Sequence, residues 1–267
     1  MWKWQAEGQP KAVVVIIHSA YEHHLRYAWQ IKQWRSAGFH VVMGDLPGHG
    51  KNGINHTVHR ESFEVYEGAV NEMLEVAIDL ELPVFIVAHG LGATLAINYL
   101  SNHSVEVAGA VFTSPWLQLI RTPSKLSSAL SGLSKITSQM KIKHDITIED
   151  LTRNPEVIEL ERDDEYYKPL ITIGWYKELQ AYMKQATSGK QKYPDIPTFV
   201  QTAGHDLISD KEVSKHWLKQ QVLHDFRYKE WREANHDLFQ EPERNDVFTN
   251  SHLFIKSILN SIGYVVK

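Results

Sequence analysis

The segment 84–94 reads VFIVAHGLGAT, an apolar run that enters a turn of small residues and continues into a helical pattern. This is the context of the nucleophile elbow G-x-S-x-G, in which a serine on a sharp strand-to-helix turn attacks an acyl carbon. Here the pattern reads A-x-G-x-G, with Gly90 at the position of the serine. The turn predicts acyl-transfer chemistry, but the oxygen that performs it is absent. Fold and function therefore need separate arguments.

Polar residues also follow other strand-like runs of the chain. Active sites of open α/β sheets lie at the carboxyl ends of the strands, so these segments are expected to meet at one edge. They are 18–24 (HSAYEHH), 45–50 (DLPGHG), 203–206 (AGHD) and 233–237 (EANHD).

The elements that would position these segments alternate between strand-like and helical patterns. Continuous β-branched runs such as 11–17 are typical of strands buried on both faces of a parallel sheet. The predicted strands are 11–17, 39–45, 84–87, 107–113, 197–202 and 226–231. Helical patterns cover about 25–37, 62–78, 91–100, 212–222 and 246–262. This alternation predicts the α/β class, with a mostly parallel sheet flanked by helices.

The alternation stops between Leu117 and Pro194, where helical periodicity and segregated charges replace it. We predict a core formed by 1–116 and 195–267, with 117–194 as an inserted helical lid. One helical face of the lid would carry Leu126, Leu130, Leu133 and Met140. This basic amphipathic stretch favours either transient contact with an anionic membrane surface or a solvated lid helix.

Composition narrows the function classes. The 267 residues are 43% hydrophobic and 22% charged, as in an ordinary globular domain, and the net charge of −4 argues against nucleic-acid binding. The absence of cysteine excludes disulfides and thiolate metal sites. Fifteen histidines are present, but no helical histidine pair is accompanied by a carboxylate ligand, so neither a metal nor a cofactor is expected. No run resembles a signal peptide or a membrane span, which predicts a cytoplasmic protein.

At these motifs the chain resembles the monoacylglycerol lipase, lysophospholipase and serine aminopeptidase family of the α/β-hydrolase superfamily. That family shows H-G-x-G-E-H, D-x-x-G-H-G, G-H-S-M-G-G, a late G-x-x-D and a final histidine, in this order. The matching residues are His18, Glu22, His23, Asp45, Gly48, His49, Gly50, His89, Gly92, Gly204 and His236. The segment 151–157 (LTRNPEV) is also similar to a cap segment of bacterial members.

The resemblance implies an α/β-hydrolase fold and an ester substrate, such as a small acyl ester or a lysolipid. It implies that Asp206 is the acid and His236 the base of the triad. The backbone N–H groups of Ala20 and Leu91 would form the oxyanion hole. Of the other residues, Asp210 is expected to cap the following helix, and His18 and His49 to brace loops by hydrogen bonds.

Three residues depart from the family pattern. Gly90 replaces the nucleophile, and Ser19 and Tyr21 replace the two glycines of H-G-x-G. Glycine adopts the positive φ of the elbow without strain, so Gly90 favours the fold while it removes covalent catalysis. Tyr21 would reshape the oxyanion pocket.

Three hypotheses follow. The chain is an inactivated variant or divergent form of a lysophospholipase-type ester hydrolase, in which case Gly90→Ser restores activity if only the serine was lost. Alternatively, it is a natural non-catalytic relative that binds a lipid-like ligand or a protein partner in the former cleft. In the third hypothesis, His236 activates a water in place of the serine. The oligomeric state is not predicted.

Overall fold

The computed structural model describes residues 1–53, 57–123 and 137–263. A seven-stranded sheet in the order β1-β3-β2-β4-β5-β8-β9 forms its centre, and every neighbouring pair is parallel except β1 with β3. The strands are β1 (Trp2–Trp4), β2 (Ala12–Ile17), β3 (Phe39–Met43), β4 (Val84–His89), β5 (Gly109–Thr113), β8 (Thr198–Ala203) and β9 (Phe226–Trp231).

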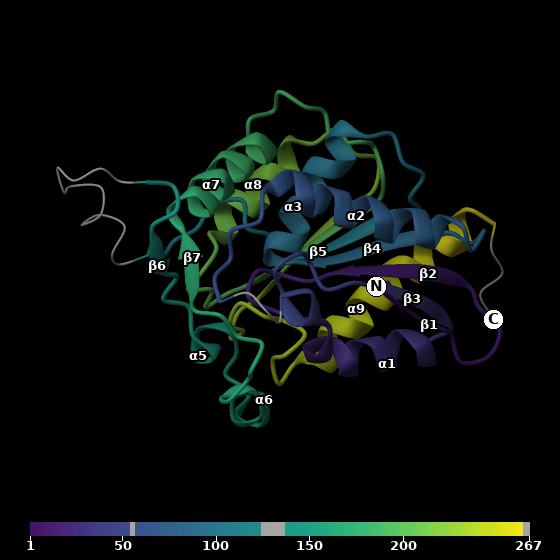
Figure 1. The fold of residues 1–267 in the computed structure, drawn as a ribbon. Helices are drawn as coiled ribbons and strands as arrows, with labels where there is room; N and C mark the ends of the chain where they lie inside the picture. Colours follow the sequence, from purple (N-terminus) through teal and green to yellow (C-terminus); the bar gives the residue numbers. More distant parts are fainter. Residues whose placement is uncertain (54–56, 124–136, 264–267) are drawn as a thin grey trace.

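Two helical layers cover the sheet (Figure 1). The helices α1 (Ala28–Ser36) and α9 (Arg244–Ser261) pack on one face. The other face is covered by α2 (Phe63–Ile78), α3 (Gly90–Asn102), α7 (Ile173–Thr187) and α8 (Lys211–Gln220). Short 3-10 turns, η1 (His24–Tyr27) and η2 (Gly50–Gly53), lie in the loops after β2 and β3.

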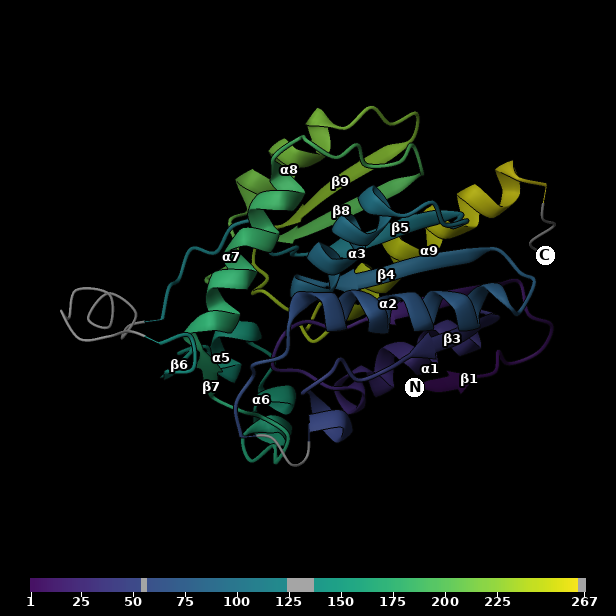
Figure 2. The ribbon, with the colours of Figure 1, turned by 45° about the horizontal axis from the view of Figure 1, so that its top comes forward.

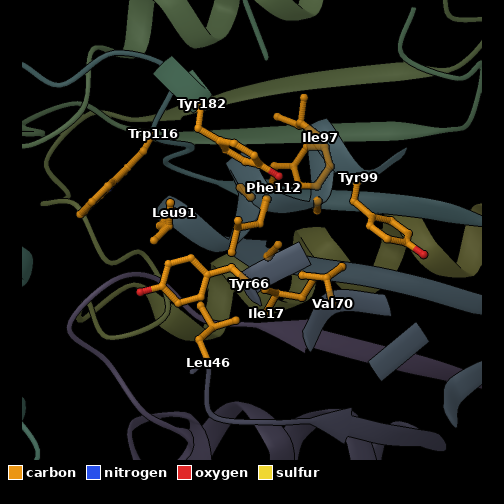
Figure 3. Packing of buried hydrophobic residues seen from close by; sticks show 14 of the residues in the cluster. Ile17, Leu46, Tyr66, Val70, Leu91, Ile97, Tyr99, Phe112, Trp116 and Tyr182 are labelled. Carbon is orange, nitrogen blue, oxygen red and sulfur yellow. The ribbon is translucent and has the colours of Figure 1, made fainter. Parts of the chain in front are cut away.

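The strand β2 shows why the sheet needs both layers. Its residues are fully buried and alternate in direction, because successive side chains of a strand point to opposite faces. Val13, Val15 and Ile17 join the cluster beneath α2 and α3, whereas Val14 and Ile16 join the cluster beneath α1 and α9. Figure 3 shows the first cluster, in which Leu91 and Trp116 of the candidate site pack with core residues.

The segment between β5 and β8 forms a separate group of elements at one end of the sheet (Figures 1 and 2). It contains β6 (Lys141–Lys143), α5 (Ile148–Leu151), α6 (Pro155–Glu161) and β7 (Leu170–Thr172), followed by α7. The predicted helical lid thus also contains an antiparallel strand pair, β6 with β7. Leu126, Leu130 and Leu133 lie outside the described residues, and Met140 precedes β6 rather than lying in a helix. We call residues 117–194 the insertion below.

The predicted α/β class with a mostly parallel sheet is confirmed. Within the described ranges, no helix is long and apolar enough to span a membrane.

Candidate active site

The turn between β4 and α3 has the geometry of an elbow. Gly90 is the first residue of α3 and has φ +51°, a conformation that L side chains adopt only with strain. Gly92, two residues later, allows α3 to approach β2 closely. A β-carbon added to Gly92 would lie 2.5 Å from the carbonyl oxygen of His18 and nearer still to that of Ile17. The elbow is therefore held directly against the loop that follows β2.

This close approach predicts that Gly92→Ala strongly destabilises the folded state, because the new methyl group meets backbone atoms rather than flexible side chains. We expect a loss of about 3 kcal/mol in the free energy of unfolding, measured by urea denaturation. Gly68→Ala in α2 is the matched control, since an added β-carbon there meets no atom within 4 Å. It should stabilise the protein by about 0.5–1 kcal/mol. Equal effects of the two substitutions would contradict the packing argument.

His236 and Asp206 form a buried pair across the ends of β8 and β9. His236 Nδ1 donates to Asp206, with distances of 2.9 Å to Oδ2 and 3.0 Å to Oδ1. The N–H groups of Ile208 and Ser209 donate to Oδ1 at 2.8 and 2.9 Å, and Ser209 Oγ donates to Oδ2 at 2.8 Å. These contacts fix the carboxylate and thereby the orientation of the imidazole.

The charges of the pair stabilise each other. Burial alone would raise the pKa of Asp206, but the facing His236 and the donated hydrogen bonds lower it. Burial alone would lower the pKa of His236, but Asp206 outweighs burial and raises it. The pair is therefore suited to hold a proton on His236.

The other ring nitrogen of His236 is already occupied. Trp116, in the loop after β5, donates its indole N–H to His236 Nε2 at 2.9 Å. In an elbow enzyme this nitrogen accepts the proton of the nucleophile. Both Trp116 and His236 are almost entirely buried, with 1% and 0% exposed. The indole thus takes the place of the missing hydroxyl as the hydrogen-bond donor to the base.

Ser19 fills the space beside Gly90. Its hydroxyl accepts the N–H of Leu91 at 3.1 Å, one of the two donors that the resemblance assigns to the oxyanion hole. A β-carbon on residue 90 would lie 2.8 Å from Ser19 Cβ, closer still to Ser19 Oγ, and 3.1 Å from Trp116 Nε1. The position of a nucleophile side chain is therefore enclosed by Ser19 and Trp116. In the described part of the chain, the second donor, Ala20 N–H, has no acceptor.

Tyr21 links this loop to the insertion. Its backbone has φ +68°, which is unusual for a side chain of this size. The phenol ring stacks on the imidazole of His144, with 3.6 Å between ring centroids and 5° between planes. His23 makes a second link, since its Nε2 lies 2.9 Å from Asp164 Oδ2. The loop after β2 is thus joined to the insertion at two points.

His18 and His49 both make hydrogen bonds to the backbone of loops at the site. His18 Nε2 accepts the N–H of Leu46 at 2.8 Å, while its Nδ1 lies 2.7 Å from the Ser19 carbonyl oxygen. His49 Nδ1 lies 3.0 Å from the carbonyl oxygen of Pro47. The capping prediction is confirmed, because Asp210 accepts the N–H of Glu212.

A buried charge cluster lies under the site. Arg26 donates to Glu22 Oε1 at 2.7 Å, pairs with Glu161 Oε2 at 2.7 Å, and reaches Asp237 Oδ2 at 3.3 Å. Burial opposes ionisation of Glu22, but Arg26, the Tyr27 hydroxyl and two nearby histidines together outweigh it and lower the pKa of Glu22 to about 2. Burial and the nearby Glu22 raise the pKa of Asp237 to about 7. His89 faces both carboxylates, 3.8 Å from Glu22 Oε1 and 4.0 Å from Asp237 Oδ1.

These three residues, Glu22, His89 and Asp237, place ligand-type atoms within 4.8 Å of one another, as a metal site would require. Arg26, however, already supplies a positive charge to both carboxylates. The cluster therefore reads as a brace that joins the loop after β2 to the loop of His236. Trp116, Arg26 and Asp237 were not identified from the sequence, since none belongs to a recognised motif. Asp237 is adjacent to His236, which is the single sequence signal that pointed to it.

A cavity of about 230 Å³ lies beside the site, between the loop after β2 and the insertion. Its lining includes Tyr21 and Arg26 from the core and Ile148, Leu151 and Tyr167 from the insertion. Acidic side chains, Glu149, Glu161 and Asp164, complete its wall together with Arg162 and Thr147.

The mostly parallel sheet, the turn at Gly90 and the buried pair of His236 and Asp206 are together the features of an α/β-hydrolase fold. Residues 8–243 match the family model described as serine aminopeptidase, S33, and the chain belongs to that family.

Similarity to individual proteins extends over nearly the whole chain. It is 37% identical over 256 residues to phospholipase YtpA of Bacillus subtilis, covering 95% of this chain and 98% of that protein. It is 24% identical to a monoacylglycerol lipase of Mycolicibacterium smegmatis, covering 96% and 92%. The crystal structure of a monoacylglycerol lipase from Paleococcus ferrophilus superposes with a TM-score of 0.80, at 23% identity and coverage of 96% and 98%.

Proposed function

We propose that this chain is a carboxylic ester hydrolase of the lysophospholipase and monoacylglycerol lipase type, with Asp206 and His236 as its acid–base pair. The observation that carries this proposal is the buried hydrogen bond between His236 and Asp206 beside the elbow turn. The similarity to a phospholipase and to monoacylglycerol lipases favours an ester of a lipid with one acyl chain. A yeast monoglyceride lipase of the same fold has been crystallised with a substrate analogue.

The proposal assigns separate tasks to the two parts of the chain. Residues 1–116 and 195–267 form the catalytic core, and 117–194 form a lid over the site. A lipid would enter between them, where the cavity meets Tyr21. Contact of the lid with a lipid surface and a cytoplasmic location stay predictions from the sequence.

The geometry supports proton transfer at the carboxyl edge of the sheet. His236 accepts a proton at Nε2 when Trp116 releases that atom, and Asp206 stabilises the resulting imidazolium. The N–H groups of Ala20 and Leu91 stabilise the negative charge on the former carbonyl oxygen. The burial of all these groups excludes water and strengthens the interaction between their charges.

The test is an assay of hydrolysis with 1-acyl lysophosphatidylcholine and with a monoacylglycerol, in which the released fatty acid is measured. We expect slow but measurable turnover by the native chain, and a fall in kcat of about 10³-fold or more for His236→Ala. His216→Ala, on the exposed side of α8, is the matched control and should leave the rate unchanged. Turnover that persists in His236→Ala would contradict the proposal.

A second candidate function is binding of a lipid-like ligand or a protein partner without hydrolysis. It is favoured by the contacts of Trp116 with His236 and of Ser19 with Leu91, which satisfy the two polar groups that catalysis would use. In that case the native chain shows no turnover, but an ether analogue of lysophosphatidylcholine raises its melting temperature. If the ether lipid does not change the melting temperature, binding of a lipid-like ligand is contradicted, and binding of a protein partner is then the alternative.

A further inference from the structure

We propose that Ser19, in the loop after β2, supplies the nucleophilic hydroxyl that residue 90 lacks. The inference rests on the proposed function and concerns the same site. It moves the reacting oxygen from the elbow to the neighbouring loop.

The first argument is the position of the Ser19 side chain. A β-carbon on residue 90 would overlap with Ser19 Oγ and lie 2.8 Å from Ser19 Cβ. An elbow serine carries its hydroxyl one bond beyond that β-carbon. Ser19 Oγ therefore borders the place of an elbow side chain, although Ser19 belongs to the loop after β2.

The second argument is the set of neighbours around this oxygen. Leu91 N–H donates to Ser19 Oγ at 3.1 Å, and this donor belongs to the residue directly after the elbow position. The backbone N–H of Ser19 donates to Glu22 Oε2 at 3.0 Å, which fixes the loop against the charge cluster. Ser19 is 2% exposed, so its hydroxyl is held in a dry and defined place.

The third argument concerns the base. Trp116 Nε1 lies 3.1 Å from the same added β-carbon and donates to His236 Nε2 at 2.9 Å. Ser19 and the indole of Trp116 thus both border the place of a side chain on residue 90, and the indole occupies the base. The proposal requires the indole to turn away from Nε2, so that the Ser19 hydroxyl can reach this atom. Gly90 is the small residue that leaves room for this arrangement.

The reaction would proceed as a two-step ester hydrolysis. Ser19 Oγ forms a bond to the ester carbonyl carbon while its proton passes to His236 Nε2. The bond from that carbon to the alcohol oxygen then breaks, and the alcohol leaves with the proton from His236. Water, deprotonated by His236, attacks the acyl-Ser19 ester, and the free acid and Ser19 are regenerated. Leu91 N–H moves from Ser19 Oγ to the former carbonyl oxygen, where the N–H of Ala20 joins it.

The main experiment is labelling by a fluorophosphonate probe with mass mapping of the adduct, in parallel with the hydrolysis assay. We expect the adduct on Ser19 in the native chain, no adduct in Ser19→Ala, and a fall of about 10³-fold or more in kcat/KM for Ser19→Ala. Ser36→Ala is the matched control, since Ser36 lies at the exposed end of α1. Trp116→Phe removes the indole donor and should raise both labelling and kcat.

The absence of cysteine from the chain provides a second readout that does not depend on turnover. In Ser19→Cys, position 19 carries the single thiol of the protein, so any thiol adduct reports on it alone. We expect reaction with a small alkylating reagent at a rate that falls at least tenfold when His236→Ala is added, because the imidazole promotes formation of the thiolate. Equal rates with and without His236 would show that the two side chains do not interact.

The two proposals fail in different ways. Hydrolysis that needs His236 but continues in Ser19→Ala within about threefold, with no adduct on Ser19, overturns the role of Ser19 and leaves the proposed function intact. Neither hydrolysis nor labelling in the native chain overturns both. Circular dichroism of Ser19→Ala and of Ser19→Gly shows whether a lost rate reflects lost fold.

Discussion

Gly90→Ser alone is expected to lower the free energy of unfolding by about 1–3 kcal/mol and to add little esterase activity. The new side chain would overlap with Ser19 and press on the indole of Trp116. It would also replace glycine at φ +51°, where a serine is strained. This result would differ from the expectation for a chain that has lost only its serine. The measurements are urea denaturation and release of p-nitrophenol from a short acyl ester.

The paired substitution Ser19→Gly with Gly90→Ser should behave differently. It removes the side chain that occupies the space and returns the hydroxyl to the elbow. We expect at least a 10²-fold higher kcat/KM than that of Gly90→Ser alone, because Leu91 N–H is released for the oxyanion. Ser19→Gly alone is the control, and it should be inactive. High activity of Gly90→Ser alone, with unchanged stability, would contradict the crowding at this site and favour the inactivated-variant hypothesis.

The protein is also expected to lose several kcal/mol of stability between pH 6.5 and pH 4. Burial lowers the pKa of His49 to about 3 and of both His89 and His144 to about 4, and it also lowers the pKa of His18 and His59. Through most of this window the side chains of His49, His89 and His144 are neutral when folded and protonated when unfolded. The unfolded state therefore binds more protons, and stability falls as the pH falls. A shift from 6.5 to about 4 corresponds to about 3 kcal/mol for His89.

Asp237 opposes this trend. Its pKa of about 7 means that the folded state holds one proton that the unfolded carboxylate lacks between pH 4 and 7, which favours the folded state on the acid side. One such group does not balance several histidines. Urea denaturation at pH 7, 6 and 5 measures how the free energy of unfolding depends on pH. His49→Gln should weaken this dependence by the contribution of one histidine. A stability that is constant from pH 7 to pH 5 would show that the histidines are not buried as described.

The sequence predicted most of the sheet because its buried strands are continuous apolar runs. The strand predicted at 11–17 matches β2 (Ala12–Ile17), and α2 begins directly after Ser62. Strand β1 (Trp2–Trp4) was missed, since three alternating residues at an edge give no periodic signal. The pair β6 with β7 was missed for the same reason, inside a segment whose helical periodicity dominated.

The candidate site divides in a similar way. His236 and Asp206 lie in motifs with a fixed order, so the resemblance named both. Trp116 could not be named, because its role depends on where the loop after β5 meets that of His236. The contact of Ser19 with Leu91 joins residues 72 positions apart, which neither motif alone reveals. Local patterns pointed to the candidate residues that lie in motifs, while tertiary contacts add Trp116 and bring Ser19 to Leu91.

The stacking of Tyr21 on His144 has a consequence for how the molecule admits a ligand. The ring of Tyr21 belongs to the core loop that carries Ser19, whereas His144 belongs to the insertion. Under the proposed function, an acyl chain that displaced this part of the insertion would break the stack, which lies on a residue whose backbone has φ +68°. Entry and the state of the reactive loop are then energetically linked, and the linkage acts in both directions. The stack of Tyr21 on His144 would then hold the insertion against the core until a ligand fills the cleft.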